Sequence, residues 1–253
     1  PEQYYADLIK TTITQIRQKG KRLAFFIVEP IMGCGGQIIL PASFMTEAFK
    51  SVKEAGGLCI VDEVQIGFGR VGSHFWGFEM SGVIPDIITI GKSIGNGHPL
   101  SVVITKKNIA EVFNNGMEYF NSFGGNPVSS EIGQAVLDII KEEDLQKNAY
   151  ETGTYLLTGL EDLKDKYHII GDIRGCGLFI GIELIKNYEN MLPAAHEAEL
   201  VVNQMKQKGV LISLDGPDYN VLKIKPPLVF NKNNADYLLE SLEAVMVDNN
   251  FRV

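Results

Sequence analysis

Three kinds of feature are scarce in this sequence of 253 residues. No apolar run approaches the roughly 18 residues that a membrane-spanning helix needs, so no membrane partner is expected. Positive charge is short as well, because 23 lysines and arginines face 31 acids and the net charge is −8, which argues against a nucleic-acid partner. Cys34, Cys59 and Cys176 form no CxxC pair, so the sequence predicts no metal site, and a reducing compartment is the default.

The chain also lacks an initiating methionine and a recognisable leader, since it begins at Pro1. We therefore expect a fragment or a processed chain. For the same reason the absence of a targeting signal leaves the compartment open, and we expect an intracellular protein of the cytoplasm or the mitochondrion.

Two short apolar runs are present, and each one stops at chemically reactive residues. Residues 58–61 stop at Asp62 and Glu63, and residues 87–90 stop at Gly91 and Lys92. Such runs are typical of buried strands in a parallel sheet, where ligands bind beyond the carboxyl ends of the strands. The pattern thus predicts a carboxylate and a lysine at one sheet edge. A pyridoxal phosphate (PLP) enzyme needs this pair, a lysine for the cofactor aldehyde and a carboxylate for its pyridinium nitrogen.

Residue types and spacing alone leave simpler interpretations open. A lysine after a strand is usually a solvated surface charge. An Asp-Glu pair after a strand is often the N-cap of the next helix. His98 follows in a glycine-rich turn, and we interpret it as structural, because a lysine of this kind needs no separate base.

The order of predicted elements indicates an α/β protein. A strand at 23–28, a helix at 43–55 and the strand that ends at Asp62 form a strand–helix–strand unit. After Asp144 the pattern changes to helices and strands of an α+β kind, with one strand expected at 210–214. We therefore predict residues 1–143 as part of a large domain with a mainly parallel sheet, and 144–253 as a small C-terminal domain.

The stretches DEVQIGFGRVG and PDIITIGKSIGNGHP, residues 62–72 and 85–99, together resemble the signature of class III aminotransferases. These are PLP enzymes of fold type I, so the resemblance implies that architecture. It implies that Lys92 is the Schiff-base lysine and that Asp62 is the pyridinium partner. By the same resemblance Val64 packs on a face of the ring, and Gln65 hydrogen-bonds the ring hydroxyl.

The segment YFNSFGGNP, residues 119–127, resembles a loop of the same family. There a threonine reaches the PLP phosphate of the neighbouring subunit, and Ser122 stands at that position here. Because serine keeps the hydroxyl, the resemblance implies that Ser122 binds the phosphate and that the protein is a homodimer with shared active sites.

Within the family, GCGGQIILPA, GMEYFNSFGGNPVS, IGDIRGCGLFIGIEL and DGPDYNVLKIKPP resemble the ethanolamine-phosphate and phosphohydroxylysine phospho-lyases. Alanine–glyoxylate aminotransferases are the nearest competitors. Many class III transaminases have a carboxylate-gripping arginine where this chain has Lys223, and often a glutamate where it has Cys34. Lysine cannot make arginine's bidentate fork, so both differences argue against a site for an ordinary amino-acid carboxylate.

Three residues are predicted to contact the small-molecule amine substrate, namely Glu29, Arg70 and Lys223. Arg70 and Lys223 each also have a simpler interpretation. Arg70 lies in the glycine-rich GFGRVG stretch, where it could bind an anion or hold a loop or subunit contact. Lys223 could equally be a strand residue that faces solvent.

Three functions follow from this resemblance. The first is elimination of phosphate from a phosphorylated amino-alcohol such as phosphoethanolamine, giving an aldehyde, ammonia and phosphate. The second is transamination with a keto-acid acceptor. The third is a catalytically silent fragment. Members of the family carry a further N-terminal portion with a phosphate-binding turn and a stacking aromatic, which this sequence lacks, so this chain alone is expected to bind PLP weakly or not at all.

Overall fold

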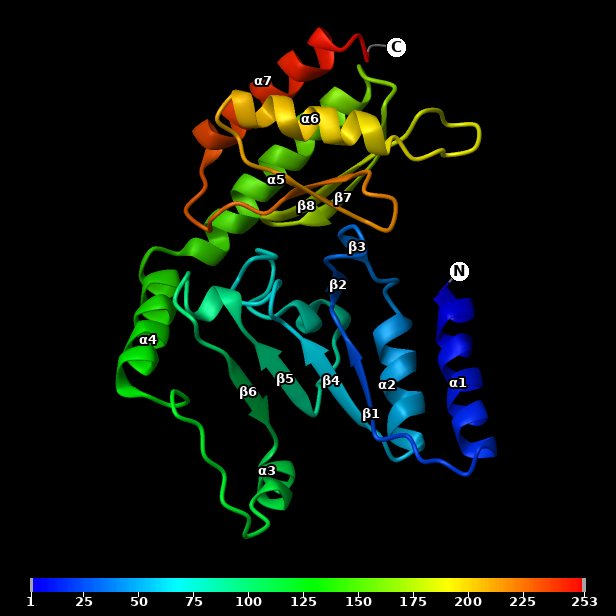
Figure 1. Cartoon of the computed structure of the whole chain (residues 1–253), viewed down its shortest axis with the longest axis vertical. Helices are drawn as coiled ribbons and strands as arrows, with labels where there is room; N and C mark the ends of the chain where they lie inside the picture. Colours follow the sequence, from blue (N-terminus) through cyan, green and yellow to red (C-terminus); the bar gives the residue numbers. More distant parts are fainter. Residues whose placement is uncertain (1, 252–253) are drawn as a thin grey trace. The chain divides into compact units, whose positions relative to one another are not determined.

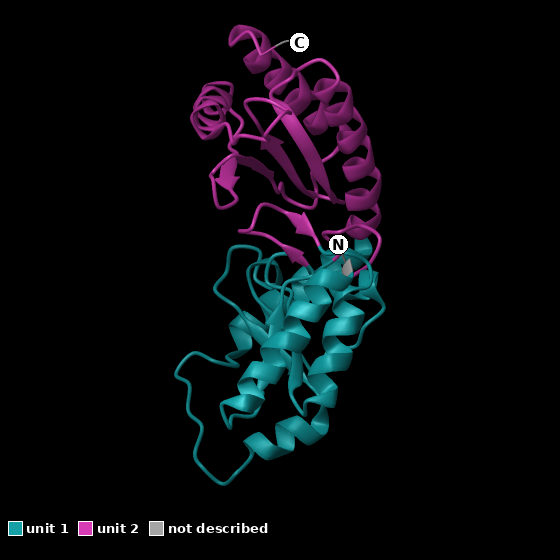
Figure 2. Ribbon diagram, turned by 90° about the vertical axis from the view of Figure 1, so that its right-hand side faces the viewer, with its two compact units in different colours: residues 1–30, 40–68, 76–143 teal, residues 31–39, 69–75, 144–253 magenta. Residues whose placement is uncertain are grey.

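The computed structural model describes residues 2–251 and contains two compact units (Figures 1 and 2). Unit 1 comprises Pro1–Pro30, Leu40–Phe68 and Trp76–Glu143. Unit 2 comprises Ile31–Ile39, Gly69–Phe75 and Asp144–Val253. The sequence predicts two uninterrupted domains, and the structure differs because two short N-terminal segments belong to unit 2. Hydrogen bonds explain this placement: the Gly216 amide donates to Cys34 O, and the Leu178 amide donates to Arg70 O.

Unit 1 contains a four-stranded sheet in the order β1-β4-β5-β6. β1, β4 and β5 are parallel, and β6 is antiparallel to β5, so the sheet is mainly parallel as the sequence predicts. Its strands are β1 (Phe25–Val28), β4 (Leu58–Asp62), β5 (Ile87–Ile90) and β6 (Val102–Thr105). Its helices are α1 (Glu2–Gln18), α2 (Phe44–Glu54), η1 (Gly77–Ser81), η2 (Lys92–Ile94), α3 (Lys107–Phe113) and α4 (Pro127–Glu142).

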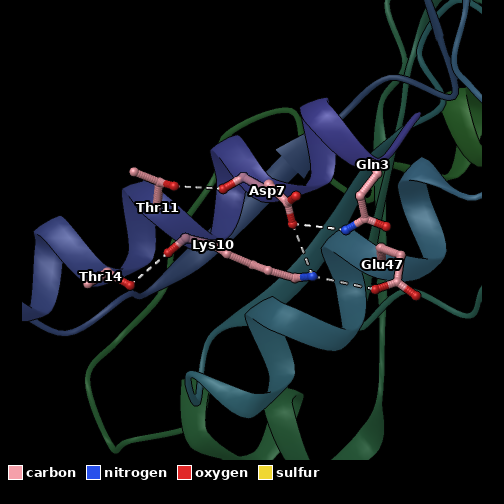
Figure 3. A network of polar contacts seen from close by, with 6 residues as sticks. All are labelled: Gln3, Asp7, Lys10, Thr11, Thr14 and Glu47. Atoms are coloured by element: carbon pink, nitrogen blue, oxygen red, sulfur yellow. Dashed lines mark hydrogen bonds and ion pairs between the residues drawn. The ribbon is translucent and has the colours of Figure 1, made fainter. Parts of the chain in front are cut away.

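One face of this sheet packs against α2, which in turn packs against α1. Cys59 and Val61 of β4 are completely buried there, together with Met45 and Val52 of α2. Polar contacts border this small core on the surface of α1 and α2 (Figure 3). There Lys10 Nζ lies 3.4 Å from Asp7 Oδ1 and 3.8 Å from Glu47 Oε2.

The opposite face of the unit 1 sheet is apolar and largely uncovered. We call it the open sheet face. Because Ile27 pairs with Ile60, Ile60 with Ile87 and Thr89 with Val103, alternate residues of the four strands share this face. Phe25 is 52% exposed, Ile27 48% and Val103 65%. Its apolar members are Phe25, Ile27, Leu58, Ile60, Ile87 and Val103.

Unit 2 contains an antiparallel sheet in the order β7-β8-β10-β9 and a two-stranded hairpin. The strands of the sheet are β7 (Ile170–Cys176), β8 (Phe179–Leu184), β9 (Ser213–Asp215) and β10 (Val221–Ile224), and the hairpin is β2 (Ile31–Met32) with β3 (Ile38–Ile39). The helices are α5 (Leu145–Lys164), α6 (Ala195–Gln207) and α7 (Lys232–Asp248). This arrangement is the α+β organisation that the sequence predicts.

The core of unit 2 is formed by the sheet and its three helices. Leu156 and Leu160 of α5, Val201 of α6 and Leu242 of α7 are buried against Ile182 of β8. Asn231 caps α7, as its Oδ1 accepts a hydrogen bond from the Asn234 amide at 3.1 Å.

The strand expected at 210–214 is shorter and shifted, since β9 is Ser213–Asp215. The reason lies at the end of α6. The Val210 amide donates to Met205 O at 2.9 Å, and Gly209 adopts the left-handed φ of 79° that closes the helix. Val210 therefore completes the helix end and cannot also begin the strand.

Candidate active site

The carboxyl ends of β4 and β5 place the predicted carboxylate and lysine at one sheet edge. Asp62, the last residue of β4, pairs with Thr89 of the neighbouring parallel strand β5. Lys92 lies three residues beyond Thr89, at the start of η2. The structure thus brings together the ends of the two runs that the sequence singled out.

Lys92 is held in an unusual backbone conformation. Its φ is 41°, in the left-handed region that residues other than glycine seldom adopt. The preceding Gly91 is extended, with φ −160° and ψ −159°. The chain turns sharply at this point, which leaves the Lys92 side chain exposed at the sheet edge. Strained residues of this kind concentrate at functional sites.

Asp62 is half-buried, and its Oδ1 accepts a hydrogen bond from the Val64 amide at 2.9 Å. In the described part of the chain, no lysine or arginine forms an ion pair with it. Asp62 belongs to the side of the sheet that carries the open sheet face, because it pairs with Thr89 and Thr89 with Val103. A carboxylate that is held in place by a hydrogen bond and has no cation beside it can accept a hydrogen bond from a protonated nitrogen of a ligand.

Val64 and Gln65 lie in the turn that follows Asp62. The Val64 side chain lies beside Gly91 and fills the space that a side chain would take there, since a Cβ added to that glycine would lie 3.4 Å from Val64 Cγ1. Val64 is therefore next to the residue that precedes Lys92. Gln65 is buried, with 8% of its surface exposed. The roles of both residues toward a ring stay predictions.

Glu63 is the residue of this edge to which the sequence assigned no role. Its side chain is completely buried, with Oε1 accepting from the Phe78 amide at 2.8 Å and Oε2 from the Gly77 amide at 3.0 Å. Burial raises the pKa of the Glu63 carboxyl to about 7, against the opposing effect of these two hydrogen bonds. Its only signal in the sequence is an acid directly after an apolar run.

The other predicted residues of unit 1 lie at different places. Glu29 is half-buried and follows β1, whose Val28 pairs with Val61, so it stands at the same edge as Asp62. Ser122 is exposed in the irregular segment between α3 and α4. His98 Nε2 lies 2.8 Å from Ser129 Oγ, a contact that ties the turn after η2 to the first turn of α4.

Arg70 and Lys223 both belong to unit 2, and both have partners there. Arg70 Nη1 donates to Pro226 O at 2.8 Å and to Leu178 O at 3.0 Å, and burial lowers the pKa of its guanidinium to about 10. Lys223 Nζ lies 2.7 Å from Asp215 Oδ2, which also accepts a hydrogen bond from Gln37 Nε2. These contacts supply structural roles for both side chains, and their roles toward a substrate stay predictions.

The donor set at the edge of unit 1 fits PLP better than it fits a metal. An exposed primary amine and an unneutralised carboxylate at the ends of adjacent strands match the two attachments that the cofactor's aldehyde and ring nitrogen require. Among residues 2–251, no group of three or more histidine, cysteine, aspartate or glutamate side chains could hold a metal ion. Within the same residues, no helix has the length and apolarity to cross a membrane.

Comparison with known protein families gives one match that extends over nearly the whole chain. The family described as Aminotransferase class-III matches residues 2–246. A Drosophila melanogaster protein named alanine–glyoxylate aminotransferase 2-like is 49% identical over 248 residues, which cover 96% of this chain and 50% of the relative. The chain therefore spans about half the length of this curated relative.

Comparison with solved structures identifies two informative relatives. A phospholyase from Arthrobacter in complex with phosphoethanolamine has a TM-score of 0.93 and 40% identity, over 97% of this chain and 58% of that chain. An amine transaminase from an uncultivated Pseudomonas species in a PLP-bound form has a TM-score of 0.87 and 32% identity, over 98% and 58% of the respective chains. The fold of type I PLP enzymes is thereby confirmed.

Proposed function

We propose a function that starts from one fact: this chain belongs to the class III aminotransferase family. We infer that it supplies the lysine and the carboxylate of a PLP-dependent phospho-lyase. The substrate would be a phosphorylated amino-alcohol such as phosphoethanolamine. The observation that carries the proposal is the placement of Asp62 and Lys92 at the ends of two neighbouring parallel strands. A fold-related phospholyase holds phosphoethanolamine, which supports this substrate class.

The residues of the edge would divide the work as follows. When bound, PLP supplies an electron sink for the carbon that bears the substrate nitrogen. Lys92 would hold the cofactor through its amine and, once released, move the proton from that carbon. Asp62 would keep a proton on the ring nitrogen, Val64 would contact a ring face, and Gln65 would bond the ring hydroxyl.

The net reaction breaks the carbon–oxygen bond to phosphate, which leaves as inorganic phosphate. Water then releases ammonia and an aldehyde from the remainder, so no oxidant or reductant is needed. Within unit 2, the ion pair of Lys223 with Asp215 supports a substrate without a carboxylate. A lysine neutralised at 2.7 Å has little charge left for a carboxylate, and it lacks arginine's fork.

Attachment of the cofactor tests the first part of this proposal. The longest form of the protein is incubated with PLP, reduced with borohydride and digested, and peptide mass spectrometry should place the added mass on Lys92. Lys92→Ala should abolish the labelling because no other amine at this edge is expected to react. The matched control is Lys107→Ala, at an exposed lysine of α3, which should leave the labelling unchanged. Labelling that persists in Lys92→Ala would assign the role elsewhere.

Transamination is the second candidate, favoured by the 49% identity to the Drosophila protein that is named an aminotransferase. Both reactions need the same first proton removal, so Asp62 and Lys92 cannot distinguish them. A product assay can. With phosphoethanolamine we expect equal amounts of phosphate and aldehyde without any keto acid, whereas keto-acid-dependent amine transfer with no phosphate release would favour the transaminase.

Substitution of Lys223 sharpens this choice. Lys223→Arg should raise kcat/KM for amino-acid donors relative to phosphoethanolamine, because arginine restores planar recognition of a carboxylate. The measurement is the ratio of the two kcat/KM values in wild type and variant. An unchanged ratio would place Lys223 outside the substrate pocket, in a structural ion pair with Asp215.

A further inference from the structure

Glu63 occupies a position whose chemistry the proposed function does not use. It is a completely buried carboxylate directly after Asp62, and in the described part of the chain no lysine or arginine forms an ion pair with it. A buried carboxylate without a cation is costly unless hydrogen bonds satisfy it. The contacts of Glu63 must therefore offset the cost of burying its carboxylate.

The contacts of Glu63 reach three separate parts of unit 1. Its side chain accepts from the amides of Gly77 and Phe78, at the start of η1. Its own amide donates to Thr89 O of β5 at 2.9 Å. Its carbonyl accepts from the amides of Ile66 and Gly67, which closes the turn of residues 63–67. Glu63 thus joins this turn both to η1 and to the strand that leads to Lys92.

The packing around these bonds leaves little freedom. A Cβ on Gly77 would lie 2.5 Å from Ile66 Cγ2, and a Cβ on Gly67 would lie 3.0 Å from the Trp76 ring. Trp76 and Phe68 also stack edge to face, with ring centroids 5.4 Å apart. The start of η1 and the turn 63–67 are therefore in direct contact, with Glu63 hydrogen-bonded between them.

The alternation of side chains along the chain transmits this constraint to Asp62. Successive residues at the end of a strand point to opposite faces, so Asp62 and Glu63 lie on opposite sides of the backbone. Fixing Glu63 on the η1 side fixes the peptide between the two residues. The Asp62 side chain is then held by that peptide and by the Val64 amide, at 2.9 Å from Oδ1.

We propose that Glu63 is a positioning residue that orients Asp62 and the turn of Val64 and Gln65 toward the ligand, through its buried hydrogen bonds to Gly77 and Phe78. The proposal rests on the proposed function for the identity of the ligand. The orientation of Asp62 itself is a property of the ligand-free chain, so it can be tested without PLP. The elevated pKa of the Glu63 carboxyl agrees with a group that the fold keeps buried for its geometry.

The first test measures hydrogen exchange of the Val64 amide in the ligand-free protein, because this amide reports the position of Asp62 Oδ1. Glu63→Gln puts an NH2 group opposite one of the two amide donors, so it should speed Val64 exchange by about tenfold, the equivalent of one hydrogen bond. The control is Glu54→Gln, at an exposed acid of α2 away from the Glu63 contacts, which should leave the rate unchanged. Unchanged Val64 exchange in folded Glu63→Gln would overturn the proposal.

The second test is a double-mutant cycle on PLP affinity. If Glu63 acts through Asp62, the variant Asp62→Asn/Glu63→Gln should bind PLP as weakly as Asp62→Asn alone, to within about twofold. Independent losses that multiply would contradict the proposal. The cycle uses the longest form of the protein, because this chain alone is expected to bind PLP weakly or not at all. If the longest wild-type form binds no PLP, the proposed function fails, and the Val64 exchange rates still decide the role of Glu63.

A folding defect in Glu63→Gln is covered by a second variant. Glu63→Asp keeps the charge and shortens the side chain by one methylene, so it should lengthen both bonds to η1 and speed Val64 exchange less than Glu63→Gln would. Wild-type exchange at Val64 in this variant would equally count against the proposal.

Discussion

Units 1 and 2 each contain a four-stranded sheet, but only unit 2 completes its core. In β8 every residue except Glu183 is buried, while β1 alternates exposed and half-buried residues. Parallel sheets are normally covered on both faces, and the open sheet face of unit 1 is not. The chain also spans only about half the length of the Drosophila relative. The difference indicates that unit 2 is self-sufficient and that unit 1, which carries Asp62 and Lys92, is not.

The strongest test of this comparison separates the units. Residues 144–253 expressed alone should fold cooperatively, because the buried cluster of unit 2 draws all its residues from Leu156 onwards. Residues 1–143 alone should show no cooperative thermal transition, because their sheet has one apolar face in water. Circular dichroism during heating provides the measurement. A sharp transition in residues 1–143 would show that the open sheet face needs no cover.

A matched pair of substitutions applies the same comparison to single side chains. Ile182 of β8 is completely buried and Ile27 of β1 is 48% exposed. Ile182→Ala should lower the free energy of unfolding by about 2–5 kcal/mol, through lost burial and a residual cavity. Ile27→Ala should lower it by less than about 1 kcal/mol. Chemical denaturation of both variants provides the values, and equal losses would mean that β1 is covered in solution.

Glu63 should make the stability of unit 1 depend on pH between about 4.5 and 7. An acid whose pKa is raised by folding, here from 4.5 to about 7, binds its proton more tightly in the folded state. The contribution of Glu63 to the free energy of unfolding is therefore fully present below pH 4.5. It is lost as the pH rises through about 7, by about 3 kcal/mol in total. Denaturation at a series of pH values should show this decline, and Glu63→Gln should remove it.

Asp86 acts in the opposite direction and provides the internal control for that experiment. Burial alone would raise the pKa of the Asp86 carboxyl, but hydrogen bonds from Lys106 Nζ and the Cys59 amide outweigh burial and lower it. Its contribution is present above its unfolded pKa of 3.8 and is lost as the pH falls further. A decline between pH 4.5 and 7 that persists in Glu63→Gln would therefore have a source other than these two acids.

Much of the fold and the core of the candidate site could be predicted from the sequence by itself. Strand ends are local features, and two apolar runs that stop at Asp62 and Lys92 were enough to place both residues at one sheet edge. The class III resemblance covered the same residues, and the family match over residues 2–246 confirms it.

Only the tertiary structure decided what surrounds these residues. The bonds from Gly77 and Phe78 to Glu63 join residues about 14 positions apart, and those of Arg70 to Leu178 and of Lys223 to Asp215 join elements that no local pattern relates. The assignment of residues 31–39 and 69–75 to unit 2 has the same origin. Local periodicity reports which face of an element is apolar, whereas burial of a charge and the choice of its partner depend on which distant backbone amides fold against it.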